Sequence, residues 1–94
     1  MEKEERLDLY RAAITKWGEV PQLNMLHEEM GELLTAIARY QRGRDSEEDV
    51  ITELADLSIM IEQMGVIFGY EKYEAEKDRK LIRLRDEKLT EGEK

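Results

Sequence analysis

Apolar residues recur at helical spacing through most of the chain, and this periodicity limits the fold more than any other feature. Before Gly18, the side chains of Leu7, Tyr10 and Ile14 fall on one helical face, and similar apolar stripes follow further along the chain. Gly18, the run RGRD and Gly69 interrupt the pattern, and glycine commonly follows the last residue of a helix. The sequence therefore predicts an all-α protein.

The interruptions divide the chain into four predicted helices within one domain, residues 1–94. We expect helices at about 2–17, 21–41, 46–68 and 71–89, followed by a frayed tail at 90–94. At the start of the third helix, Ser46 and Asp49 have the spacing of a capping box. The fourth helix has few apolar residues, so we expect it to be exposed or covered by a second copy. The expected protomer is a four-helix bundle completed by oligomerisation.

Charge and composition exclude several classes of protein. The net charge of −8 does not favour binding to nucleic acid, and the absence of cysteine excludes disulfides and thiolate metal sites. No apolar run approaches the roughly 20 residues that a membrane-spanning helix needs. The charged N-terminus, MEKEERLDLY, lacks the apolar core of a signal peptide. We therefore expect a cytoplasmic protein with neither a membrane nor a nucleic-acid partner.

A short acidic pattern occurs twice, as EMGEL and as ELADL, and both copies read acid, two spacers, acid, leucine. On a helix of about 100° per residue, the two acids of each copy lie about 40° and about 100° to the same side of the leucine. If the two helices pack antiparallel through their apolar stripes, four carboxylates converge. These four are Glu29, Glu32, Glu53 and Asp56.

Four converging carboxylates repel one another, so either some are protonated or a cation lies among them. Oxygen ligands favour Mg²⁺, with Mn²⁺ as a substitute, over zinc. Glu28 points further from the stripe and either supports the ligands or acts as a base on a metal-bound water. Asp49, one turn before Glu53, is a candidate fifth donor. The alternative is that these acids form the solvated flank of ordinary amphipathic helices.

The same residues resemble the MazG-like, all-α nucleoside triphosphate pyrophosphohydrolases. The family pattern is E-E-x-x-E followed by E-x-x-D, and this chain has EEMGE and ELAD. The similarity continues through ELLTAIARYQRG and ELADLSIMIEQMGVIFG and covers about residues 17–84. The resemblance therefore involves both acid pairs, the additional acid of the doublet and their helical context.

The resemblance implies a specific reaction. Members of the family hydrolyse the α–β phosphoanhydride of nucleoside and deoxynucleoside triphosphates, which releases the monophosphate and pyrophosphate. They use Mg²⁺ and work as homodimers or dimers of dimers. The implied catalytic residues are the doublet Glu28 and Glu29, with Glu28 as the accessory acid. The implied metal ligands are Glu29, Glu32, Glu53 and Asp56.

Basic residues that contact the substrate phosphates are harder to assign from the sequence. Lys80 and Arg83 share one face of the fourth predicted helix, and the resemblance implies a basic pair in this region, so we expect them to bind substrate. Acids alternate with bases along this helix, so a solvated charged face is the competing interpretation. Arg39, Arg42 and Arg44 lie near the loop before the third helix and either contact phosphate or balance the nearby acids.

Two alternative functions remain open. Phosphoribosyl-ATP pyrophosphohydrolases share the acid motif, but they usually have a Ser-Tyr-Thr start and a lysine shortly before the doublet. LYRAAITKWGEVPQLNMLHEE contains neither feature, so this alternative ranks second. A non-catalytic helical module for oligomerisation or adaptor binding would explain the apolar stripes, although it would not explain two acid pairs in the same helical phase.

Overall fold

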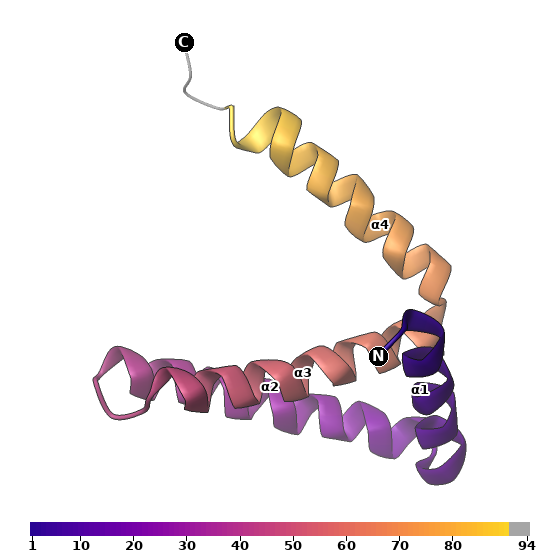
Figure 1. Cartoon of the computed structure of the whole chain (residues 1–94), viewed down its shortest axis with the longest axis horizontal. Coiled ribbons are helices and arrows are strands. Elements are labelled where there is room, and N and C mark those ends of the chain that lie inside the picture. The colour runs from indigo at the N-terminus through magenta and orange to yellow at the C-terminus, as the bar shows by residue number, and fades with distance from the viewer. Residues whose placement is uncertain (91–94) are drawn as a thin grey trace.

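The computed structural model describes residues 1–90 and confirms the predicted all-α architecture (Figure 1). Its elements are α1 (Lys3–Trp17), α2 (Glu19–Gln41), α3 (Glu47–Phe68), α4 (Tyr70–Arg83) and a π-helical extension, η1 (Leu84–Lys88). Of the predicted frayed tail at 90–94, only Thr90 lies within the described residues. No helix in residues 1–90 combines the length and the apolar character that crossing a bilayer requires.

The antiparallel pair of α2 and α3 forms the largest helix–helix contact in the structure. Gly43, with a φ of 74°, turns the chain between them, and Arg39 Nε bonds Asp45 Oδ1 at 2.7 Å across the turn. The predicted capping box is confirmed. The Ser46 hydroxyl accepts a bond from the Asp49 backbone N–H at 3.2 Å, and Asp49 Oδ2 accepts one from the Ser46 backbone N–H at 2.9 Å.

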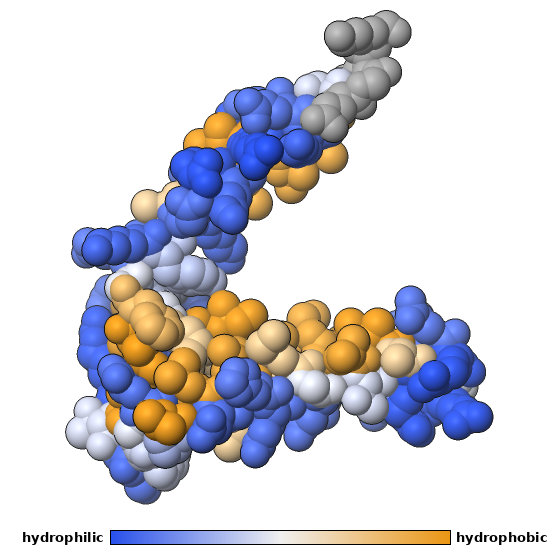
Figure 2. All heavy atoms as spheres, turned by 180° about the vertical axis from the view of Figure 1, so that it is seen from behind, coloured by the Kyte–Doolittle hydropathy of each residue, from blue (hydrophilic) through white to orange (hydrophobic). Residues whose placement is uncertain are grey.

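The hydrophobic core is small, because α1 covers only one end of the α2–α3 pair (Figure 1). The buried apolar side chains in the described residues are Leu7, Tyr10, Ala36 and Met60. Much of the apolar stripe on α2 and α3 stays accessible to water, and Phe68, for example, is 71% exposed. In Figure 2, apolar side chains gather along the edge of this helix pair that faces the opening toward α4. The predicted stripes therefore exist, but the described residues leave much of them uncovered.

α4 leaves the helix pair at an angle and packs on α3 only near its own first turns (Figure 1). The close approach depends on Gly65 of α3. A Cβ atom at this position would lie 3.0 Å from the Tyr73 ring and 3.1 Å from the Tyr70 ring. The two rings also contact each other edge to face, with centroids 5.6 Å apart. Gly65 thus provides the space in which the start of α4 is seated.

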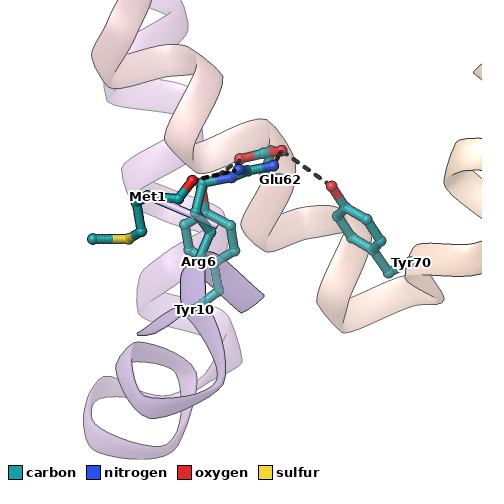
Figure 3. Close-up of polar contacts among 5 residues, drawn as sticks. All are labelled: Met1, Arg6, Tyr10, Glu62 and Tyr70. Atoms are coloured by element: carbon teal, nitrogen blue, oxygen red, sulfur yellow. Dashed lines mark hydrogen bonds and ion pairs between the residues drawn. The ribbon is translucent and has the colours of Figure 1, made fainter. Parts of the chain in front are cut away.

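Glu62 of α3 joins α1 and α4 through one carboxylate (Figure 3). It accepts hydrogen bonds from Arg6 and the Tyr10 hydroxyl of α1, and from the Tyr70 hydroxyl of α4 at 3.0 Å. Partial burial favours a higher pKa for Glu62, but these bonds outweigh it and hold the pKa below its usual value. Burial and the bond to Glu62 also raise the pKa of Tyr10 to about 12. This cluster, Arg6, Tyr10, Glu62 and Tyr70, is called the Glu62 junction below.

Gly65→Val tests the seat of α4. The added branched side chain collides with both tyrosine rings, so we expect a loss of about 1–3 kcal/mol in the free energy of unfolding. Gly31→Ala is the matched control, because nothing lies within 4 Å of a Cβ at that helical position. The control should gain up to about 1 kcal/mol from helix propensity alone. Urea unfolding followed by circular dichroism measures both, and equal stability of the two variants would contradict this account.

Glu62→Gln tests the electrostatics of the junction. A carboxyl whose pKa is lower in the folded than in the unfolded state stabilises the fold at pH values above its ordinary pKa, and this stabilisation is lost as the pH falls through the folded value. We therefore expect the variant to lose about 2 kcal/mol at neutral pH, the scale of hydrogen bonds to a charged group. The difference from wild type should shrink below the ordinary carboxyl range.

Glu74→Gln is the control for the same pH series. Glu74 bonds Lys3 at 2.7 Å, but both side chains are nearly half exposed, so removing this pair should change the stability far less than Glu62→Gln does. Thermal unfolding curves recorded between neutral and acidic pH provide the comparison. A difference between Glu62→Gln and wild type that stays constant over this range would show that the carboxylate charge is not what stabilises the junction.

Candidate metal centre

The two acid pairs face each other where α2 and α3 run antiparallel. One carboxylate oxygen from each of Glu29, Glu53 and Asp56 lies within 4.8 Å of the corresponding oxygens of the other two. Glu29 comes from α2, and Glu53 and Asp56 come from successive turns of α3. These three residues, called the acid centre below, were all expected from the repeated pattern. The helices thus bring together carboxylates that are 24 or more positions apart in the sequence.

Glu32, the fourth predicted ligand, lies at the edge of the acid centre. Its side chain is exposed, and it is not one of the three that share the closest spacing. Its carboxyl still acts on both neighbours, since its charge and its hydrogen bonding help to raise the pKa values of Glu29 and Glu53. Of the four predicted ligands, the structure therefore brings three into the closest group, and Glu32 lies beside it.

The electrostatics of the acid centre are unfavourable for the carboxylates alone. Loss of hydration is the largest cause that raises the pKa of Glu29, followed by the charges of Glu32, Asp56 and Glu53. Loss of hydration likewise comes first for Glu53, followed by Glu32 and Asp56. The Oε2 atoms of Glu29 and Glu53 are buried and accept no hydrogen bond from any described residue. A cation or a shared proton would satisfy these oxygens.

The donor set fits a hard divalent cation. All three groups are carboxylates, and the chain's single histidine, His27, is an exposed residue. Carboxylate oxygens suit Mg²⁺ and Mn²⁺, whereas structural zinc sites usually contain histidine or cysteine ligands. The unsatisfied Oε2 atoms of Glu29 and Glu53 are the observation that favours a cation over an ordinary solvated flank.

An open groove of ≈ 520 Å³ runs beside the acid centre. Its lining includes Glu28, Glu32 and Glu53, with Thr35 and Asp45 toward the loop. Glu28 is exposed and lines this groove together with Glu53 of the acid centre. A base that receives a proton from water needs this kind of position, accessible to solvent yet next to the reacting group.

The structure gives Asp49 and Asp45 roles in the loop between α2 and α3. Asp49 Oδ2 is committed to the cap of α3, and bonds from the Ser46 backbone and side chain lower the pKa of Asp49. Asp45 pairs with Arg39 and also lines the groove, a position that the sequence did not indicate. The spacing of Ser46 and Asp49 in the sequence was enough to predict the cap. No motif or spacing near Asp45 in the sequence predicted its position beside the groove.

Lys80 and Arg83 lie far along α4, which has no contact with α2 in the described residues. Arg83 Nε bonds Glu87 Oε2 at 3.3 Å, and Lys80 lines an apolar groove on α4 itself. Because α4 leads away from the helix pair in Figure 1, the predicted substrate-binding pair and the acid centre of the same chain are separated.

Comparison of the chain with protein-family models, with curated proteins and with solved structures finds no match. The functional argument therefore rests on the motif, on the geometry of the acid centre and on its unsatisfied oxygens.

Glu53→Gln tests the acid centre directly. Without metal, the variant should be more stable than wild type, because one buried charge and its repulsion are removed. With Mn²⁺ or Mg²⁺, wild type should gain about 2.7 kcal/mol at a metal concentration 100 times the dissociation constant, and Glu53→Gln should gain far less.

Glu48→Gln is the matched control, because it removes the same charge from an exposed position on the same helix. It should keep the full stabilisation by metal. Melting temperatures of the three proteins, measured with and without each cation, show whether stabilisation by metal depends on Glu53. If wild type and Glu53→Gln respond equally to metal, the acid centre does not hold the ion.

Proposed function

We propose that the protein is a Mg²⁺-dependent nucleoside triphosphate pyrophosphohydrolase that cleaves the α–β phosphoanhydride and belongs to the MazG-like family. The observation that carries the proposal is the acid centre, in which Glu29, Glu53 and Asp56 converge from two helices with buried oxygens left unsatisfied. The E-E-x-x-E and E-x-x-D motifs supply the same three residues. Regulation or cleansing of the nucleotide pool would be the physiological role.

The acidic surface explains why a cation is needed for such a substrate. A triphosphate is strongly anionic, and a chain of net charge −8 would repel it. Bound Mg²⁺ would offset this repulsion and the charge that develops on the leaving pyrophosphate. Glu29, Glu53 and Asp56, with Glu32 beside them, would hold the ion next to the groove.

Glu28 would act as the base in the proposed reaction. It is exposed and lines the open groove, where it can accept a proton from the attacking water. The water oxygen then forms a bond to the α-phosphorus while the bond from that phosphorus to the bridging oxygen breaks. Pyrophosphate leaves with the bridging oxygen. No covalent enzyme intermediate is needed, and the chain has no cysteine that could form one.

Hydrolysis in H₂¹⁸O tests both the activity and the bond that breaks. Purified protein is incubated with each common nucleoside or deoxynucleoside triphosphate and Mg²⁺, and the products are analysed by mass spectrometry. We expect monophosphate and pyrophosphate, with ¹⁸O in the monophosphate. Release of diphosphate and inorganic phosphate would contradict the proposed cleavage, and ¹⁸O in pyrophosphate would contradict attack at the α-phosphorus.

Glu32→Gln and Asp56→Asn test the residue assignment. Each removes one proposed ligand charge, so we expect turnover to fall by about 100-fold or more, equivalent to about 3 kcal/mol of transition-state stabilisation. Both variants should remain folded, as judged by circular dichroism, because losing a charge relieves repulsion. A variant that retains nearly the wild-type rate would remove that residue from the proposed site.

Self-association is part of the proposal, as a homodimer or a dimer of dimers. It is supported by the apolar surface that one copy leaves exposed, which includes Met30 at 52%, Leu54 at 53% and Phe68 at 71%. Monomeric proteins rarely expose continuous apolar patches of this kind. Sedimentation velocity of the purified chain measures the state directly.

A non-catalytic helical module is the second candidate, and the same exposed apolar surface favours it. Calorimetry with Mg²⁺ and Mn²⁺ separates the two functions, because an adaptor module should give no saturable heat. Phosphoribosyl-ATP belongs in the substrate panel as well, because the related pyrophosphohydrolases that act on it share the acid motif.

A further inference from the structure

The groove beside the acid centre follows one face of α2 toward the loop that leads to α3. At about 100° per residue, Glu32 lies about 40° to one side of Glu28 on the helix, and Thr35 lies about 20° to the other. All three residues line the groove. Arg39 falls between them, about 20° from Glu28, and lies about 6 Å beyond Thr35 along the axis. The same face of α2 therefore runs from the proposed base to a guanidinium at the loop end.

An ion pair holds Arg39 at the loop end of the groove. Its Nε donates to Asp45 Oδ1 at 2.7 Å, and Asp45 itself lines the groove. The Asp45 side chain is only 17% exposed, whereas that of Arg39 is 44% exposed. A guanidinium has five N–H donors and this bond uses one of them, so the two Nη groups can still bind a second anion. The pair thus fixes the position of Arg39 and leaves most of its donors available.

The lining of the groove is otherwise acidic. It includes the carboxylates of Glu28, Glu32, Asp45 and Glu53, and no basic residue is among the residues that line it. The two cations that the sequence predicted for substrate binding lie on α4, which has no contact with α2 in residues 1–90. Arg39, through its bond to Asp45, is the cation that the chain's own fold brings to this end of the groove.

We propose that Arg39 is a further catalytic residue, which binds the leaving pyrophosphate at the loop end of the groove with the Thr35 hydroxyl beside it. The inference rests on the proposed function and adds the phosphate-binding cation which that function lacks. In-line displacement places the attacking water and the leaving group on opposite sides of the α-phosphorus. Because Glu28 would activate the water from one end of the groove, pyrophosphate would leave toward the other end, where Thr35 and Arg39 lie.

The charge of Arg39 matches what the leaving group needs. When the bond between the α-phosphorus and the bridging oxygen breaks, that oxygen keeps the electron pair and pyrophosphate gains negative charge. A guanidinium presents parallel N–H donors, which suit the oxygens of a phosphate. Arg39 stays protonated throughout, and the proton of the attacking water goes to Glu28. A donor that is in place before charge develops lowers the barrier without any reorganisation during the reaction.

Calorimetry with inorganic pyrophosphate and Mg²⁺ tests the contact without relying on turnover. Arg39→Gln removes the guanidinium, so we expect the affinity for pyrophosphate to fall by about 10-fold or more, the scale of a charge-assisted hydrogen bond. Arg11→Gln is the matched control. Arg11 is also an exposed arginine that bonds an aspartate, at 3.0 Å, but it lies on α1, at the opposite end of the helix pair from the loop (Figure 1). An equal loss of affinity in both variants would show that general positive charge attracts the anion, and would overturn the proposal.

Asp45→Asn separates the phosphate contact from the ion pair. The variant loses the pair but keeps the guanidinium and removes one carboxylate from the groove, so its affinity for pyrophosphate should equal or exceed that of wild type. Arg39→Lys keeps the positive charge, so it should bind pyrophosphate more tightly than Arg39→Gln does. Circular dichroism verifies that each variant is folded. If Asp45→Asn weakens binding as much as Arg39→Gln, the lost ion pair is the cause and Arg39 does not contact phosphate.

Rates with the best triphosphate of the substrate panel distinguish this proposal from the proposed function. If Arg39 stabilises the leaving group, Arg39→Gln should lower kcat by about 10-fold or more, and Arg11→Gln should leave it unchanged. A wild-type rate in Arg39→Gln, with unchanged affinity for pyrophosphate, would overturn the role of Arg39 while the proposed function stands. If wild type hydrolyses no triphosphate but binds pyrophosphate through Arg39, the proposed function fails while the anion site stands. A wild-type chain that binds no pyrophosphate would overturn the site itself.

Discussion

The antiparallel contact between α2 and α3 determines both the fold and the candidate chemistry. Apolar residues on the facing sides of these helices bring them together. The acids that flank the same stripes therefore lie close to one another. Two of the resulting carboxylate oxygens lie in a place that water does not reach. The packing of the helices thus holds like charges together, and a cation or a shared proton would offset their repulsion.

Much of this could be predicted from the sequence because it depends on local periodicity. The phase of Glu29 relative to Leu33 equals that of Glu53 relative to Leu57, and two helices with equal phase present their acids to the same groove when they pack antiparallel. The cap formed by Ser46 and Asp49 was likewise predictable, because it depends on two residues only three positions apart. In both cases the relevant residues are related by helical geometry alone.

The Glu62 junction could not be predicted in the same way. Its partners Arg6 and Tyr10 lie 56 and 52 positions away, and neither spacing nor residue type links them before the helices are assembled. The same limit applies to Lys80 and Arg83. Their helical face was evident from the sequence, but the direction in which α4 leaves α3 was not. That direction decides whether a basic residue reaches the acids of its own chain.

The direction of α4 depends in part on Gly65, which has no side chain to collide with the rings of Tyr70 and Tyr73. The angle between two arms of a molecule also decides whether reciprocal contacts close into a finite pair or continue from copy to copy. If the chain self-associates as proposed, a small change in the angle of α4 would leave the apolar surfaces exposed. It would alter how two copies fit together. Contacts that no longer close within a pair would continue from copy to copy, so a larger residue at position 65 would favour open-ended assembly.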